Sequence, residues 1–495
     1  MRQKTVSRWI RRAVLGLALA AVPALPAAAA PVKNPVAAQD QVIYFVFTDR
    51  FHNGDKTNDA NTDPKDPHAY HGGDLQGVID KLDYIKGLGA TTLWISPFND
   101  NQDNAYLGKY WGYHGYWIQN FDKVDEHMGD EATLKRLVDE AHQRGMTVLF
   151  DAIVNHTGYD APMVKDPQFD PWFHRNGGVT DWNNPYQNEN YDVAGLPDLN
   201  TENKAVLDEM TQVWADWISR TGADGFRLDT VRHVPIAFWN VFNGEMKKRF
   251  GSQFFILGEV SYHNGRTYPP YLENANLDAL FDFPQFEAMT EVFAEGKSCK
   301  LLAKALELDM LYKNPGMMVT FLDSHDEKRF MTVAGGDKAK LRLALMYQFT
   351  MRGIPMLYQG IEVGMEGGGD PDNRRDMVFD QDPKLAEVTG DLIKFRRMQP
   401  ALTRGDMRVL SVDDTSIAFS RRYKNEELVI VLNTAKTPRQ LTVTLPANGP
   451  LSQLAVVQDV VNSAKIPVSN GQVSLKLEPQ GAVILAPKSI GAQWQ

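Results

Sequence analysis

The chain repeats one pattern of hydrophobic and polar positions eight times between residues 42 and 360. Each repeat begins with a short run of β-branched and aromatic residues, continues through a polar or glycine-rich loop, and ends in a stretch of helical periodicity. EATLKRLVDEAHQRG (131–145) and KAVLDEMTQVWADWISRTG (204–222) are two such helical stretches. The eight expected strands are residues 42–47, 91–96, 147–154, 225–230, 254–260, 277–283, 317–325 and 354–360.

Eight strands that alternate with helices favour an α/β fold in which a parallel sheet closes into a (β/α)8 TIM barrel. A doubly wound open sheet is the alternative, but the number of units and the lack of a GxGxxG motif argue against it. In a barrel the carboxyl ends of all strands meet at one rim, so residues far apart in sequence converge there. Side chains at those ends are therefore the first candidates for a functional site.

Two segments depart from the repeat. Residues 156–203 form an overlong loop rich in Asp, Asn, Trp, Tyr, Gly and Pro, which predicts a small inserted subdomain after strand three, on the catalytic face. After residue 402 the helical pattern gives way to short alternating strands, which predicts a C-terminal antiparallel β-sandwich. The expected organisation is barrel over 31–155 and 204–402, inserted subdomain over 156–203, and sandwich over 403–495.

Residues 1–30 are predicted to be a signal peptide, because a basic start is followed by an apolar run and by small residues near Ala27 to Ala30. A membrane anchor is the alternative, but Pro23 and Pro26 interrupt the short apolar run. Arg11 and Arg12 raise a twin-arginine route, which the following residues fit poorly. We therefore expect an exported protein, periplasmic or extracellular, with no membrane segment in its mature form.

The charge and the cysteine content of the chain limit the kinds of ligand and cross-link that it can have. The net charge is −10, and removal of a leader with five basic residues leaves a mature chain near −15, with no basic tract for nucleic acid. A neutral polymer such as a glucan is compatible with that charge. Cys299 is the single cysteine, so no intramolecular disulfide is expected despite the export. The oligomeric state stays open.

Ionisable residues gather at the expected strand ends. An Asp at one strand end is more often a helix cap or turn residue, but the whole set together favours an active site. Acetal hydrolysis with retention needs two carboxyls about 5–5.5 Å apart, one ionised and one protonated. Arg227 would keep Asp229 ionised, and nearby carboxylates would raise the pKa of Glu259. The set comprises Asp151, Asn155 and His156 after strand three, Arg227 and Asp229 on strand four, Glu259 on strand five, and His325 and Asp326 after strand seven.

Four ordered segments, DAIVNH (151–156), GFRLDTVRH (225–233), GEV (258–260) and FLDSHD (321–326), resemble the signature regions of the α-amylase family, glycoside hydrolase family 13. LPDLN (196–200) resembles an additional region within the inserted subdomain. The resemblance implies that Asp229 is the nucleophile, Glu259 the general acid/base and Asp326 a transition-state stabiliser. It further implies that Arg227, His156 and His325 line the subsite of the reacting sugar, and that Tyr116 stacks on that sugar's ring.

The loop FHNGDKTND (51–59) and the segment HGGD (71–74) are rich in the oxygen donors that Ca²⁺ prefers. An Asx-rich surface loop is the alternative. The two segments resemble a first-loop calcium site of several family members, which implies the ligands Asn53, Asp55, Asn58, Asp59, Gly72 (carbonyl) and Asp74. A second family calcium site is matched by Asn155, Asp198 and the carbonyl of His233.

The segment GGGDPDNRRDM (367–377) follows strand eight and resembles an element that reaches sugars on the non-reducing side, through Asp370 and Arg374. A salt-bridged loop is the alternative. Arg232 and His233 resemble a basic pair on the acceptor side of α-amylases. We expect a retaining α-amylase that binds Ca²⁺ and cleaves α-1,4 bonds of starch or maltodextrins. Maltooligosaccharides are expected substrates, and cyclodextrins are candidate substrates. A cyclomaltodextrinase or neopullulanase, a 4-α-glucanotransferase, and a non-catalytic glucan-binding protein remain alternatives.

Overall fold

The computed structural model describes residues 36–102 and 104–487, and the predicted signal peptide lies outside this part of the chain. Eight parallel strands form one sheet in the order β8-β7-β6-β5-β2-β1-β10-β9. A parallel bridge between Phe281 and Val319 joins the two ends of that order, so the sheet closes into the predicted barrel. The strands are β1 (Ile43–Val46), β2 (Thr92–Ile95), β5 (Thr147–Ala152), β6 (Gly225–Leu228), β7 (Phe255–Gly258), β8 (Ala279–Leu280), β9 (Val319–Thr320) and β10 (Ile354–Tyr358).

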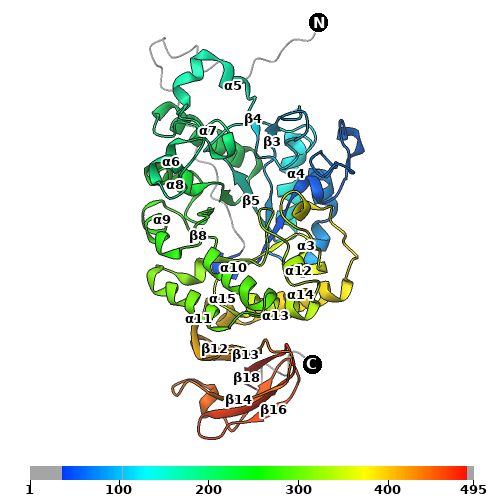
Figure 1. Ribbon diagram of the computed structural model, residues 1–495, viewed down its shortest axis with the longest axis vertical. Coiled ribbons are helices and arrows are strands. Elements are labelled where there is room, and N and C mark those ends of the chain that lie inside the picture. Colours follow the sequence, from blue (N-terminus) through cyan, green and yellow to red (C-terminus); the bar gives the residue numbers. More distant parts are fainter. Residues whose placement is uncertain (1–35, 103, 488–495) are drawn as a thin grey trace.

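Helices connect successive strands and surround the barrel (Figure 1). Both helical stretches expected from periodicity are present, as α4 (Glu131–Gln143) and α7 (Lys204–Thr221), and each begins after a side-chain cap. The other connecting helices are α2 (Leu75–Asp80), α3 (Leu82–Leu88), α8 (Ile236–Phe250), α9 (Pro269–Asn274), α10 (Phe283–Met289), α11 (Lys300–Leu306), α12 (Phe330–Val333), α13 (Lys338–Thr350), α14 (Pro383–Met398) and α15 (Pro400–Arg404).

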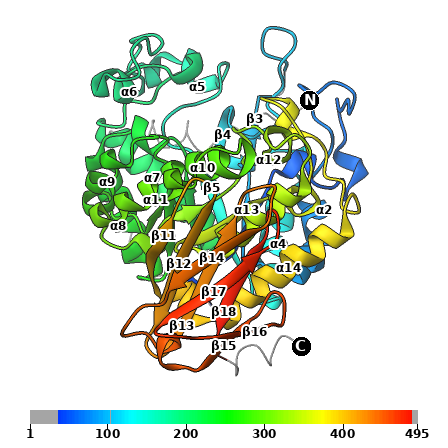
Figure 2. The ribbon, with the colours of Figure 1, turned by 60° about the horizontal axis from the view of Figure 1, so that its bottom comes forward.

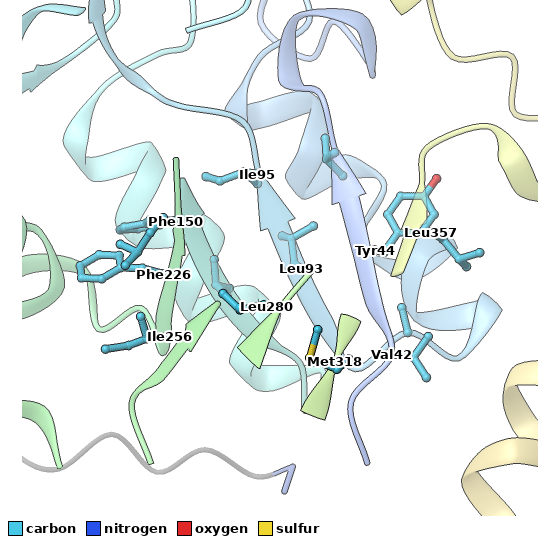
Figure 3. Packing of buried hydrophobic residues seen from close by; sticks show 14 of the residues in the cluster. Val42, Tyr44, Leu93, Ile95, Phe150, Phe226, Ile256, Leu280, Met318 and Leu357 are labelled. Carbon is cyan, nitrogen blue, oxygen red and sulfur yellow. The ribbon is translucent and has the colours of Figure 1, made fainter. Parts of the chain in front are cut away.

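Side chains of the barrel strands alternate between two apolar clusters. On β1, Ile43 and Phe45 belong to the cluster inside the barrel, whereas Tyr44 and Val46 belong to the cluster between sheet and helices. Figure 3 shows the outer cluster, in which Leu93, Phe150 and other labelled residues come from neighbouring strands. Both faces of the sheet are buried, which explains why its strands read as continuous apolar runs in the sequence.

The segment between β5 and α7 holds only short helices, α5 (Pro162–Lys165) and α6 (Pro185–Asn190), together with 3₁₀ turns. An antiparallel pair, β3 (Asn99–Asn101) with β4 (Ile118–Val124), projects after β2 and was not predicted, because its polar residues lack alternation. Among the described residues, no helix has both the length and the apolar character needed to cross a membrane.

The chain ends in antiparallel sheets that lie below the barrel in Figure 1 and come forward in Figure 2. Six strands have the order β11-β12-β13-β18-β15-β16, and β14 pairs with β17. This confirms the predicted C-terminal antiparallel fold, while the predicted domain boundaries themselves stay predictions. The strands are β11 (Asp406–Val412), β12 (Ser416–Tyr423), β13 (Glu426–Asn433), β14 (Arg439–Thr444), β15 (Val456–Asp459), β16 (Lys465–Pro467), β17 (Gln472–Leu477) and β18 (Ala482–Ala486).

Candidate active site

Arg227 of β6 is the centre of an acidic cluster at the carboxyl end of the barrel. Its guanidinium Nη1 lies 2.8 Å from Asp151 Oδ1 and 2.7 Å from Asp229 Oδ1, and its Nη2 lies 2.9 Å from Glu259 Oε2. Arg227 and Asp151 are buried, whereas the side chains of Asp229 and Glu259 keep 8% and 15% of their exposure. The two carboxylates predicted to do the chemistry are thus held together by one cation and still open to the surface.

The backbone between β6 and β7 fixes Glu259. The amide of Glu259 donates to Leu228 O, and the amide of Val231 donates to Glu259 O, which extends the parallel pairing past both strand ends. The amide of Thr230 donates to Glu259 Oε2 at 3.0 Å. Thr230 adopts a left-handed conformation with φ of 48°, which is rare for a β-branched residue and turns the chain sharply after Asp229.

Asp326 lies in the same site through a second set of contacts. Its Oδ1 accepts from Arg374 Nη2 at 3.2 Å, and its Oδ2 lies 3.3 Å from His325 Nε2. Arg374 also pairs with Asp370 at 3.0 Å and donates through Nε to the carbonyl of His325. The Asp370–Arg374 pair is therefore a salt bridge and a direct neighbour of the third predicted carboxylate. Contact of this pair with a sugar stays a prediction.

Tyr116 connects the two halves of the site. Its hydroxyl donates to Asp151 Oδ2 at 2.9 Å and lies 2.9 Å from His325 Nε2. The rings of Tyr116 and His325 are stacked, with centroids 5.3 Å apart and planes 9° apart. Trp94 Nε1 also donates to Asp151 Oδ2, at 3.1 Å. The buried carboxylate of Asp151 thus positions Arg227, Tyr116 and Trp94 together.

The histidines of the site are neutral near pH 7, because burial disfavours the imidazolium. Burial lowers the pKa of His156 to about 4 and holds the pKa of His325 well below its usual value. His156 Nε2 lies 3.2 Å from the carbonyl of Tyr116, and His325 Nε2 faces Tyr116 and Asp326. With its proton on Nε2, each of these histidines donates a hydrogen bond and adds no charge.

Burial raises the pKa of Asp229. Arg227 lowers it, as the sequence predicts, but the effect of burial is larger, and the charges of Glu259 and Asp151 raise it further. One guanidinium in contact with three carboxylates leaves excess negative charge when all are ionised. The expectation that Arg227 alone keeps Asp229 ionised is therefore incomplete, since it omitted Asp151 and the burial of the cluster.

Arg232 and His233 follow Asp229 on a 3₁₀ turn (Val231–His233) and contact the inserted segment. His233 Nδ1 donates to the carbonyl of Asn188 at 2.9 Å, and the Arg232 guanidinium lies 4.1 Å from the centre of the Tyr262 ring. Arg232 also donates to the carbonyl of Trp182, whose side chain is half exposed. These contacts bring the predicted acceptor-side pair next to α6 and leave Trp182 facing solvent beside it.

Most of the expected first-loop calcium ligands lie close together. Asn53 donates to Asp59 Oδ1 at 2.8 Å, and Asp74 accepts from the amides of Gly54, Asp55 and Gly77. The oxygens Asn53 Oδ1 and Asn58 Oδ1 are buried without a hydrogen-bond partner, and a Cβ on Gly72 would lie 2.6 Å from Asp59 Oδ1. Such orphaned oxygens beside carboxylates fit a hard cation. Asp55 is exposed, and its carboxylate accepts from Thr57.

The second predicted metal site has a similar pair of orphaned oxygens, Asn155 Oδ1 and Asp198 Oδ1. The other carboxylate oxygen of Asp198 accepts from His174 Nδ1 at 2.5 Å, and His174 also pairs with Glu202. The donors fit Ca²⁺, although His174 already supplies a cation there. Among the described residues, no group of three or more His, Cys, Asp or Glu side chains is arranged to hold a metal ion by itself, so amides and carbonyls would have to complete either calcium site.

Two further residues belong to this site although no role was predicted for them. Asp151 was part of the predicted strand-end set but had no assigned role, although it contacts both Arg227 and Tyr116. Glu327, directly after Asp326, lines with Glu259 and Asp326 a cavity of about 240 Å³. Burial and the charges of Asp326 and Glu287 raise the pKa of Glu327 to about 7. Its place beside Asp326 in sequence was the one available signal.

Comparison with known proteins agrees with this geometry. The Alpha-amylase family profile, described as "Alpha amylase, catalytic domain", matches residues 45–387. A "Beta/alpha-amylase" of Paenibacillus polymyxa is 37% identical over 463 residues, which cover 89% of this chain but only 37% of that protein. A "Cyclomaltodextrinase" of Geobacillus thermopakistaniensis is 31% identical over 91% of this chain and 77% of its own length.

Among solved structures, an Anoxybacillus α-amylase superposes with a TM-score of 0.86 and 39% identity, covering 91% of this chain and 99% of that one. The family profile spans the barrel and every strand end that carries a candidate residue. The sequence resemblance, the closed barrel and the clustered carboxylates agree with these matches. The chain therefore belongs to the α-amylase family and is a glycoside hydrolase.

Proposed function

We propose that this enzyme hydrolyses α-1,4-glucosidic bonds of maltodextrins, including cyclodextrins, with retention of the anomeric configuration. The observation that carries the proposal is the contact of one guanidinium, that of Arg227, with both Asp229 and Glu259. Two carboxyls on one cation are close enough to act on the two sides of one glycosidic bond. The name of the Geobacillus relative, which the chain matches over most of both lengths, supports cyclodextrins as substrates.

In the proposed reaction, Asp229 attacks the anomeric carbon while Glu259 protonates the leaving oxygen, which gives a covalent glycosyl-enzyme. Glu259 then takes a proton from water, whose oxygen displaces Asp229 and restores both groups. Arg227 contacts both carboxylates and so balances charge as it moves between them. The neutral His325 and the ion-paired Asp326 are placed to bind hydroxyls of the distorted sugar.

Action on starch, as in an α-amylase, is the second candidate. It is supported by the 39% identity with the Anoxybacillus α-amylase over nearly the whole of that chain. Transfer to a sugar acceptor would use the same covalent intermediate. The ratio of transfer to hydrolysis therefore depends on whether water or a sugar hydroxyl reaches that intermediate. The proposed residues are the same in each case.

A time course of products from soluble starch, maltoheptaose and β-cyclodextrin, with anomers followed by NMR, separates these activities. We expect α-anomeric products and cleavage of β-cyclodextrin faster than of starch. Faster loss of starch chain length would favour the α-amylase assignment. Products of the β-configuration would contradict retention, and no turnover of any substrate would contradict hydrolysis. Added maltose tests transfer, because it would lengthen the products.

We further propose that Ca²⁺ is held by the first loop, through Asn53, Asn58, Asp59, Asp74 and the carbonyl of Gly72. Bound there, the ion would supply positive charge that ties the loop after β1 to the start of α2. The loop's buried, unpartnered amide oxygens support this assignment. Export by the leader at residues 1–30 is likewise proposed from the sequence.

A further inference from the structure

The cavity of about 240 Å³ extends to one side of the catalytic carboxylates. Arg227, His325 and Asp326 line it where the reacting sugar would lie, and beyond the acid Glu259 it continues to Ser261, His263 and Glu327. A general acid lies next to the leaving-group oxygen. The part of the cavity that continues from Glu259 to Ser261 and His263 is therefore the part that would receive the leaving sugar.

A second hollow adjoins this cavity. It has a volume of about 450 Å³, within the range of about 300–1,000 Å³ of ligand sites, and lies between the turn at Gly265–Thr267 and helices α10 and α11. We call it the α10–α11 groove. His263 lines both the cavity and the groove, so the two hollows adjoin at this residue.

The junction carries acidic groups. His263 Nδ1 lies 3.5 Å from Glu287 Oε1, and Glu287 lines the groove as Glu327 lines the cavity. The two glutamates are close enough that Glu287 contributes to the raised pKa of Glu327. The backbone amide and carbonyl of Glu327 are hydrogen-bonded, whereas its carboxyl group has no hydrogen bond to any described residue. This carboxyl group is therefore available to a ligand that passes the junction.

The groove walls have the mixed character that a sugar chain needs. Pro284, Leu301 and Leu308 supply apolar surface for the C–H faces of the rings, and Arg266 and Lys304 supply donors for hydroxyls. We propose that the α10–α11 groove holds the reducing end of a linear α-glucan beyond the cleaved bond, with Glu327 and Glu287 binding hydroxyls where the chain passes His263. This inference rests on the proposed α-1,4-glucan hydrolysis.

The test fills the groove. Ala305 is half-buried on α11 and lines the groove, so Ala305→Trp would obstruct it. Ala386 on α14 is the matched control, because it is also a half-buried helical alanine, but it lines a hollow between α3 and α14 that shares no described residue with the catalytic cavity. Glu287→Ala is a second variant at an exposed side chain, which tests the junction without a change in packing.

For amylose, we expect Ala305→Trp to lower kcat/KM about fivefold or more and Glu287→Ala about threefold, while maltotriose stays within about twofold. With maltoheptaose labelled at its reducing end, the labelled product should become shorter, because the chain can no longer extend beyond the junction. Ala386→Trp should change neither kcat/KM for amylose nor the length of the labelled product. If Ala305→Trp does not fold, Glu287→Ala decides the outcome.

Unchanged kinetics and products in folded variants would overturn the inference while leaving the proposed function intact. An equal loss on amylose and maltotriose would overturn it also, since it would indicate a structural effect. No turnover of either substrate by the unmodified enzyme would instead overturn the proposed function and, with it, the inference.

Discussion

Arg227 is the residue on which the arrangement of the carboxylates depends. It is buried and contacts Asp151, Asp229 and Glu259, and each of the three carboxylates comes from a different strand end. Loss of one partner would leave the guanidinium paired with the other two, so the cluster tolerates neutralisation at one position better than loss of the arginine. The proposed catalytic carboxylates are therefore suitable for mutation with the fold intact.

Asp229→Ala and Glu259→Gln should each abolish most hydrolysis. For Glu259→Gln we expect kcat to fall by about 10²–10⁴-fold, because the amide cannot donate a proton to the leaving oxygen. Thermal melting should show that both variants fold. Asp208→Ala, at an exposed carboxylate of α7, is the control and should keep full activity. Retention of most activity by either site variant would refute its role.

The raised pKa of Glu327 predicts that the stability of the fold depends on pH. Its pKa is raised to about 7 in the fold, from an ordinary value of 4.5, so between these pH values the folded state binds a proton that the unfolded chain has lost. Stability therefore falls as pH rises from about 4.5 to 7, and this cost remains above pH 7. Glu327→Gln should raise the melting temperature at pH 8 relative to the unmodified enzyme, but not at pH 4.5. An equal effect at both pH values would contradict the assignment.

At the scale of elements, the strand ends and helix caps follow short-range rules. Asp130 precedes α4 and accepts from the amide of Thr133 at 2.7 Å, as an N-cap does. The positions of β4 and α6 follow no such rule, although Asn184 caps α6 in the same way. β4 contacts α7, and α6 contacts the turn Val231–His233, so both positions depend on tertiary contacts.

Asp130→Ala should lower the free energy of unfolding by about 1 kcal/mol, because the first turn of α4 loses its side-chain acceptor. Denaturant titration measures the change. Asp139→Ala on the same helix is the control, since it removes an exposed pair with Lys135 that contributes only about 0.3–0.5 kcal/mol. A loss for Asp130→Ala no larger than the control would argue against a capping role.

At the scale of the molecule, a buried arginine connects the C-terminal sheet to the barrel. Arg421 of β12 donates to the carbonyl of Thr350 at the end of α13 and to that of Gly405. Within the barrel, Arg396 of α14 donates to the carbonyls of Phe349 and Met351. The two guanidiniums therefore satisfy carbonyls at the end of α13, where a helix leaves its last acceptors free. The Arg421 contact ties the sheet to the barrel without a disulfide.

The proposed calcium ion would stabilise the folded chain as a whole, because only the fold assembles its ligands. Removal by EDTA should lower the melting temperature by about 5 °C, and added Ca²⁺ should restore it. Asp59→Asn should melt lower and lose the response to EDTA, whereas Asp63→Asn, at a nearby exposed carboxylate, should keep it. A melting curve that EDTA leaves unchanged would count against the proposed calcium site.

Local sequence patterns were enough to predict the barrel, the C-terminal strands and the set of strand-end residues. The alternation of apolar residues and the helical periodicity are local signals, and parallel strands bring their carboxyl ends to one rim whatever their separation along the chain. Asp229, Glu259 and Asp326 could therefore be named as one site, with roles supplied by the family resemblance.

No sequence pattern predicted which groups share a contact or how that contact changes their pKa, because both depend on the folded chain. Asp151 and Arg227 are 76 residues apart in sequence, and the burial that raises the pKa of Asp229 comes from several strands at once. The meeting of the catalytic cavity and the α10–α11 groove at His263 likewise depends on tertiary packing. Distances across the chain and exclusion of water have no local pattern, so they arise only when the chain has folded.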